Sequence, residues 1–202
     1  QNFTTATDSH NTAVGYNAGG DVTTGVDNTL IGGLSGDAIT DADFNVAVGN
    51  SSLSANTVGS RNTAIGSSAL LVMNPSTAAD TYNTAAGYHA GRLVSTGTYN
   101  TILGSLAADS LTTGSFNVAV GADALGGSSV TSAEDNTCVG YAAGFDITTG
   151  DNNIALGHDA LRSGSPGGPA STDSNVIGLG DENIASFHCQ VALTVSSDQR
   201  DK

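Results

Sequence analysis

Few side chains in this chain are suited to catalysis or metal binding, and they are scattered. Histidine, a common base and metal ligand, occurs at His10, His89, His158 and His188, with no second ligand at metal-binding spacing. Acidic turns at 41–43 and 146–151 could hold Ca²⁺, but the G-G-x-G-x-D repeat of calcium-binding rolls is absent. No Ser–His–Asp set, phosphate loop or carboxylate pair stands out from chance. We therefore expect no metal, no cofactor and no enzymatic activity in the repeats described next.

Asparagine, whose amide both donates and accepts hydrogen bonds, recurs at a regular spacing. Nine copies of a motif such as NTAVG or NVAVG are followed by a degenerate tenth copy, NVIGLG. Six of the nine intervals are 17 residues, and the others are 19, 21 and 22. The asparagines are Asn11, Asn28, Asn45, Asn62, Asn83, Asn100, Asn117, Asn136, Asn153 and Asn175. We expect them to form a ladder of side-chain amides bonded along one axis.

A 17-residue unit is too short to fold alone and must be positioned by its neighbours. Each unit predicts a strand, a tight bend at glycine, a second short strand and a turn that accepts insertions, as at 74–76. The predicted fold is an all-β parallel β-solenoid of about ten coils, roughly 45 to 50 Å long at a strand spacing of about 4.8 Å.

The first strand of each unit has two apolar faces. The second residue after each asparagine is small or apolar, and the third is Val, Ile, Leu or Ala. Because neighbouring strand residues point to opposite faces, one set fills the coil and the other needs a partner. Packing about a threefold axis buries identical stripes, so we expect a homotrimer. Ile65 and Val120 then lie either in the core or in the interface.

Composition narrows the classes of partner. The chain has 19 acidic and 5 basic residues, a net charge of −14, which disfavours nucleic acid and anionic membranes. No run of 18 apolar residues predicts membrane insertion. Cys138 and Cys189 lie 51 residues apart, and Cys138 occupies an ordinary repeat position, so we expect no disulfide between them.

The repeats resemble two families of surface proteins. The pattern N-[TV]-[AIL]-[VIL]-G over about residues 11–180 is similar to the left-handed parallel β-roll of trimeric autotransporter adhesin heads. It is still more similar to repetitive tail-fibre proteins of phages. The resemblance implies a left-handed roll packed or intertwined as a trimer. It specifies no ligand.

The last six residues carry a second resemblance. The string S-D-x-R-x-K from Ser197 to Lys202 resembles the start of the intramolecular chaperone of endosialidases and many phage tail fibres. In that family the Ser is a nucleophile for self-cleavage and the Lys five residues later is its base. The resemblance assigns these roles to Ser197 and Lys202, with a lysine of lowered pKa as a chemically suitable base.

These patterns predict a structural and host-attachment segment of a phage tail fibre, located in the virion. Its expected partners are two further copies of itself, other virion tail proteins and a host surface receptor of glycan type. The expected parts are a lead-in (1–10), the solenoid (11–184), a C-terminal strand (185–196) and the start of a cleaved chaperone domain (197–202). The alternative is a bacterial adhesin head on the cell surface. A hexapeptide-repeat acyltransferase or an ice-binding solenoid would need repeat patterns that this sequence lacks.

Overall fold

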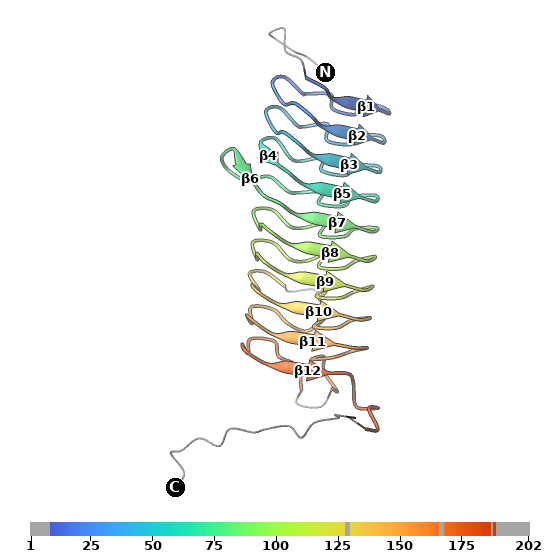
Figure 1. Ribbon diagram of the computed structural model, residues 1–202, viewed down its shortest axis with the longest axis vertical. Helices are drawn as coiled ribbons and strands as arrows, with labels where there is room; N and C mark the ends of the chain where they lie inside the picture. Colours follow the sequence, from blue (N-terminus) through green and yellow to red (C-terminus); the bar gives the residue numbers. More distant parts are fainter. Residues whose placement is uncertain (1–8, 128–129, 166–167, 187, 189–202) are drawn as a thin grey trace.

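The chain winds into a single elongated solenoid in which each coil contributes one strand to a main sheet (Figure 1). The computed structural model describes residues 9–127, 130–165, 168–186 and 188, and these contain strands and turns but no helix. The predicted all-β parallel solenoid is therefore confirmed. The strands are β1 (Thr12–Val14), β2 (Thr29–Ile31), β3 (Val46–Val48), β4 (Gly59–Ser60), β5 (Thr63–Ile65), β6 (Ala79–Asp80), β7 (Thr84–Ala86), β8 (Thr101–Leu103), β9 (Val118–Val120), β10 (Thr137–Val139), β11 (Ile154–Leu156) and β12 (Ile177–Leu179).

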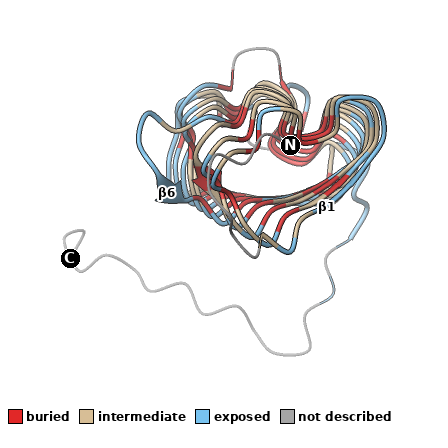
Figure 2. Cartoon of the chain, turned by 90° about the horizontal axis from the view of Figure 1, so that it is seen from above, coloured by how far each residue is buried: buried red, intermediate tan, exposed pale blue. Residues whose placement is uncertain are grey.

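Ten of these strands form one parallel sheet in chain order, from β1 to β12 without β4 and β6. Equivalent residues pair across each step, for example Thr29 with Val46 and Ile31 with Val48. Seen along the axis, successive coils superimpose and buried residues line their inner side (Figure 2). Among the described residues, no helix is long and apolar enough to cross a membrane.

The second strand predicted in each coil is wrong. The residues six and eight positions after each of the first nine asparagines, such as Ser51 (φ 55°) and Leu53 (φ 50°), are left-handed and cannot be extended. They form consecutive β-turns, in which Ser52 N–H donates to Gly49 O and Asn56 N–H to Leu53 O. Among the described residues, the one strand pairing outside the main sheet joins β4, in the preceding unit, to β6, which follows the insertion of the 21-residue unit.

The glycine that follows each main strand has no room for a side chain. Gly32 has φ +135°, and a Cβ there would lie 2.5 Å from the carbonyl oxygen of Gly49 in the next coil. That oxygen belongs to backbone held by the sheet, so it cannot move aside. The recurring glycine is thus required both by its φ and by the close approach of two coils.

Inside the coil, a strand position and a turn position face each other, and the larger side chain can come from either of them. Leu30 of β2 is buried beside Gly36, where a Cβ would lie 2.7 Å from the Leu30 Cδ2 atom. The next coil reverses this arrangement, with Ala47 on the strand and Leu53 on the turn, both fully buried.

Elsewhere the space is filled from an adjacent coil. The coil with Ala85 on the strand and Gly91 on the turn is small at both positions. A Cβ at Gly91 would lie 2.8 Å from Ile102 Cδ1 and 3.1 Å from Leu70 Cδ2 of the neighbouring coils. Large side chains thus fill the space beside small ones in the same or the adjacent coil, which keeps the interior closely packed.

Alanine substitutions at the adjacent Gly32 and Gly33 compare a glycine at the close approach of two coils with a neighbouring glycine that is not so constrained. We expect Gly32→Ala to destabilise the protein by about 3 kcal/mol, because strain at a forbidden φ adds to a backbone clash. Gly33 has ordinary φ and would meet only the Asn50 side-chain amide, at 3.3 Å. Gly33→Ala should change stability by less than about 0.5 kcal/mol. Urea unfolding at one protein concentration measures both, and equal losses would contradict the close-approach explanation.

Candidate functional site

The asparagines form a buried column that links consecutive coils. Each Oδ1 atom accepts the main-chain N–H of the asparagine in the next coil, from Asn28 N to Asn11 Oδ1 (2.7 Å) onward to Asn153 N to Asn136 Oδ1 (2.9 Å). The side-chain N–H groups donate to a turn carbonyl, as from Asn100 Nδ2 to Gly114 O (3.0 Å). One side chain therefore satisfies backbone groups of two coils.

Amide-to-amide bonds, which we expected to run along the whole ladder, are found at only some steps. Asn117 Nδ2 donates to Asn100 Oδ1 at 3.1 Å, and four other steps repeat this contact. After the 21-residue unit, Thr81 Oγ1 takes that position and donates to Asn62 Oδ1 at 2.8 Å. The continuous link is the bond from amide oxygen to main-chain N–H.

Asn175 does not belong to the column, which corrects the prediction for the tenth unit. Val176 pairs in register there, and its N–H donates to Asn153 Oδ1 at 2.9 Å. Asn175 lies one residue earlier, is exposed, and accepts a bond from Asn152 Nδ2 at 2.8 Å. In NVIGLG the glycine that matches Gly157 is Gly180, five residues after the asparagine instead of four.

The outer side of the ten-stranded sheet, here called the outward face, consists of three columns. The leading column consists of the residue immediately before each ladder asparagine, or before Val176 in the tenth unit: His10, Asp27, Phe44, Arg61, Tyr82, Tyr99, Phe116, Asp135, Asn152 and Asn175. The middle column follows it: Thr12, Thr29, Val46, Thr63, Thr84, Thr101, Val118, Thr137, Ile154 and Ile177. The trailing column ends each strand: Val14, Ile31, Val48, Ile65, Ala86, Leu103, Val120, Val139, Leu156 and Leu179.

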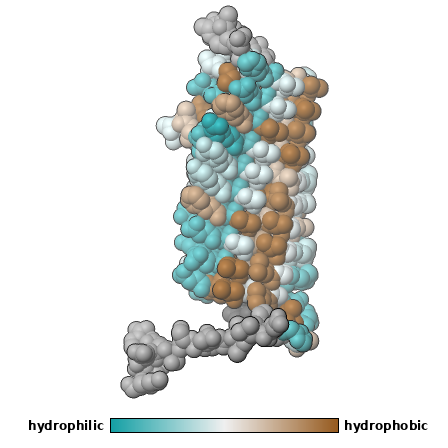
Figure 3. Space-filling view, in the orientation of Figure 1, coloured by the Kyte–Doolittle hydropathy of each residue, from teal (hydrophilic) through white to brown (hydrophobic). Residues whose placement is uncertain are grey.

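The outward face leaves much apolar surface in contact with solvent. Ile65 is 44% exposed, whereas Ala64 beside it is fully buried. The trailing column therefore lies outside the coil, and so do Ile65 and Val120, whose placement the sequence left open. Figure 3 shows the result as a band of hydrophobic surface along the rod. Only Asp27 and Asp135 of the chain's 19 acidic residues occupy these columns.

Five consecutive coils carry a stack of π systems in the leading column. Tyr99 stacks on Tyr82 and on Phe116, with ring centroids 5.0 and 5.2 Å apart. Arg61 lies over Phe44, 4.6 Å from its centroid, and its Nε donates to Asp80 Oδ2 at 2.9 Å. Since the ring faces cover one another between coils, the rings present mostly their edges to solvent. That geometry does not suit flat stacking of a sugar on these rings.

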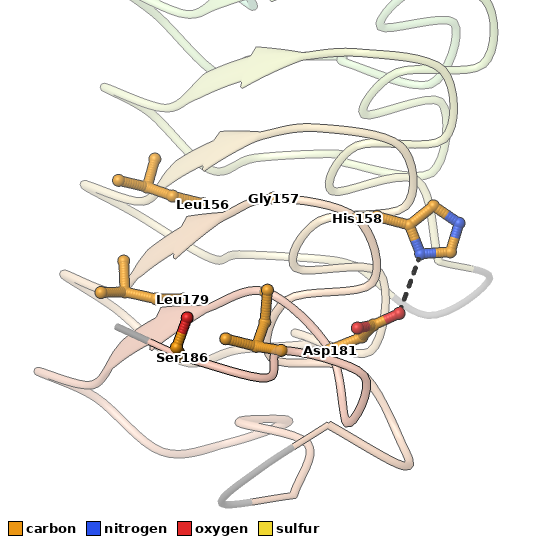
Figure 4. A pocket seen from close by; sticks show the side chains of 8 residues that line it. Leu156, Gly157, His158, Leu179, Asp181 and Ser186 are labelled. Atoms are coloured by element: carbon orange, nitrogen blue, oxygen red, sulfur yellow. Dashed lines mark ion pairs between the residues drawn. The ribbon is translucent and has the colours of Figure 1, made fainter. Parts of the chain in front are cut away.

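A cavity of about 510 Å³ lies at the C-terminal end of the trailing column. Leu156, Leu179 and Ile184 form its apolar wall, and His158 and Asp181 lie at its rim, their Nδ1 and Oδ2 atoms 3.5 Å apart (Figure 4). Hydrogen bonds from Asn183 are the main reason that the pKa of Asp181 is lowered. No sequence pattern predicted this cavity, because it depends on the turn after the degenerate repeat.

No catalytic triad or metal centre forms within the described part of the chain. Ser186 Oγ lies 3.1 Å from His188 Nε2, whereas Asp181 pairs with His158, so these groups make separate pairs. No group of three or more potential metal-ligating side chains occurs among the described residues. Burial raises the pKa of the Cys138 thiol to about 12, which keeps it protonated and unreactive near neutral pH.

The predicted self-cleavage residues Ser197 and Lys202 lie outside the described residues, as does Cys189. Of the predicted C-terminal strand 185–196, only Ala185, Ser186 and His188 are described, and none of them is in a strand. The roles assigned by the resemblance therefore stay predictions.

Comparison of the chain with protein-family models, with curated proteins and with solved structures found no match. The functional interpretation therefore depends on the fold, on the outward face and on the sequence patterns described above.

Replacement of a buried ladder asparagine tests how much the column stabilises the rod. Asn100→Ala removes the partner of Asn117 N–H (3.0 Å) and of the Gly114 carbonyl (3.0 Å). We expect a loss of about 3 kcal/mol in the free energy of unfolding, because buried polar groups lose their partners. Asn50→Ala, which removes only exposed bonds, one to Gly33 O and one from Ser51 Oγ, is the control and should cost under about 0.5 kcal/mol. A similar small cost at both positions would show that the column is not important for stability.

Proposed function

We propose that this chain forms the shaft or head of a trimeric phage tail fibre, in which it has structural and host-attachment roles. The observation that supports the proposal most directly is the outward face, an apolar surface repeated in every coil of the sheet. In a monomer, side chains such as Leu103, 38% exposed, leave a continuous apolar band in water. Contiguous apolar surface of this kind marks a contact with another molecule.

A closed homotrimer accounts for this surface. The outward face is about 13 Å wide over four residues and about 45 Å long over ten coils, which gives about 600 Å² per chain. Three such faces total about 1,800 Å², which is about 600 Å² for each of the three contacts between chains. One such contact is smaller than a typical stable two-chain interface, so the assembly depends on a closed ring in which every chain has two neighbours. Acidic side chains are concentrated elsewhere, in agreement with the depletion of charge in interface cores.

The proposal includes the partners expected from the sequence: other tail proteins and a glycan receptor on the host surface. The resemblance of Ser197–Lys202 to a tail-fibre chaperone supports the virion over the bacterial surface. A rod of stacked coils suits either location, since it separates its two ends at a fixed distance. We therefore retain the head of a trimeric bacterial adhesin as the alternative. We propose no enzymatic activity for the solenoid.

Two aspartate substitutions on one strand test the trimer. In Ile65→Asp the charge enters the outward face, and we expect trimers to dissociate into folded monomers at micromolar concentration. In Ala64→Asp, the matched control, the charge enters the core, where an unpaired charge costs several kcal/mol, so the fold itself should be lost. Light scattering measures the mass, and circular dichroism measures the β-structure. A parent protein that is monomeric at micromolar concentration would overturn the trimer.

Antibodies against the purified rod test its location. In preparations of the virus or bacterium that encodes the chain, we expect immunogold label along phage tail fibres. Antibodies preabsorbed with the purified rod are the control and should give no label. Label confined to the surface of uninfected cells would instead establish the adhesin alternative, and label at neither location would overturn both.

A further inference from the structure

We infer that the trimer closes through unlike columns, with the leading column of each chain against the trailing column of the next. This inference rests on the proposed trimer and specifies the surfaces that form it. Its partner is a second copy of this chain, in parallel orientation and at the same height.

The arrangement follows from the shape of the outward face. Three flat faces turned toward a threefold axis make the walls of a triangular prism. The middle column of each wall then points to the axis, and its two edge columns lie at corners. Because a rotation maps each chain onto the next, every corner joins a leading edge to a trailing edge. A face-to-face twofold dimer would instead allow a column to meet its own copy.

The side chains suit this pairing. The axis would be lined by the middle column, whose members Thr63, Thr84 and Thr101 are short and β-branched. At the corners the stacked rings of Tyr82, Tyr99 and Phe116, all 42 to 54% exposed, would meet aliphatic side chains. Ring edges that are solvent-exposed in the monomer would there become buried.

Backbone strain is a second observation that singles out the leading column. Phe44, Arg61, Tyr82, Tyr99 and Phe116 all have φ between 51 and 63°. Other coils place aspartate or asparagine there, as at Asp27 and Asn152, which are better suited to left-handed φ. The coil itself therefore does not require bulky π systems at this position. A lateral contact would explain why they occupy five consecutive coils.

Cysteine cross-linking tests which columns meet. The double variant Tyr99→Cys/Leu103→Cys places one thiol in each edge column of the same strand. The two positions are about 13 Å apart within a chain, beyond the limit of about 7 Å between Cα atoms for a disulfide. Oxidation should thus link neighbouring chains, and non-reducing gels should show a covalent trimer. Cys189→Ser is included in every variant, and Cys138 is protected by burial.

The single variants Tyr99→Cys and Leu103→Cys are the matched controls and should stay as unlinked chains, since neither column meets itself. A mixture of the two refolded together should give a linked dimer. If a single variant links as readily as the double variant, like columns meet and the inference is wrong. If the double variant stays unlinked while light scattering still shows a trimer, another face assembles it.

Failure of the proposed trimer can be distinguished from failure of the inferred column pairing, because a protein that does not form a trimer would be a monomer in light scattering before any oxidation. Phe116→Cys/Val120→Cys repeats the test one coil further along the rod, should the first pair impair folding as judged by circular dichroism. An offset pair, Tyr99→Cys/Val120→Cys, joins positions one coil apart and tests whether neighbouring chains lie at the same height along the rod. Stronger linking through this pair than through the same-coil pairs would rule out a closed ring.

Discussion

Hydrogen bonding between the main chains of successive coils is the interaction on which the rest of the structure depends. Thr29 N–H donates to Asn45 O and Gly32 N–H to Val14 O, both at 2.8 Å, so each coil is fixed to the next on both sides. Because these bonds set a spacing of about 4.8 Å between strands, every coil must match its neighbours in shape. Glycine recurs where two backbones nearly touch, and asparagine recurs where an amide must replace a backbone partner. The two most regular positions of the repeat are those at which neighbouring coils constrain each other most.

On the turn side of the coil, the burial of apolar side chains offsets strain in the backbone. Leu53 and Leu125 have left-handed backbone (φ 50°), which disfavours a non-glycine residue by about 1 to 2 kcal/mol. Full burial of a leucine side chain contributes about 2 kcal/mol, which offsets this strain. Where glycine stands there instead, the space is filled either by the strand residue of the same coil, as Leu30 does beside Gly36, or by side chains of the adjacent coils, as Leu70 and Ile102 do beside Gly91. The core positions can therefore vary in sequence, provided that a neighbouring side chain fills the space.

Periodic features were predictable from the sequence, and features set by local backbone geometry were not. The spacing of asparagine and glycine predicted the parallel solenoid, because stacking turns a repeat into columns. The second half of the coil was mistaken for a strand, since nothing in a leucine such as Leu53 signals positive φ. Asn175 was misplaced because the motif was aligned on its asparagine. Counting four residues back from Gly180 gives Val176, whose N–H bonds to Asn153 Oδ1 and which directly precedes Ile177, the partner of Ile154. The cavity beside Ile184 depends on a turn that occurs once, and a single copy leaves no periodic signal.

The outward face is the feature that the coil does not explain by itself. Stacking satisfies polar groups along the axis, and alternating volumes fill the interior, yet neither requires aliphatic residues on the outer side of the strands. Insertions avoid this surface: across the 21-residue unit Ile65 still pairs with Ala86, and across the 19-residue unit Val120 pairs with Val139. In the 21-residue unit the extra residues lie away from the main sheet, on the part of the coil where β4 pairs with β6. The hydrogen bonds of the sheet explain why this surface stays level through changes of repeat length, but not why it stays apolar, and the proposed neighbouring rods with the same repeat would account for its apolar character at every level.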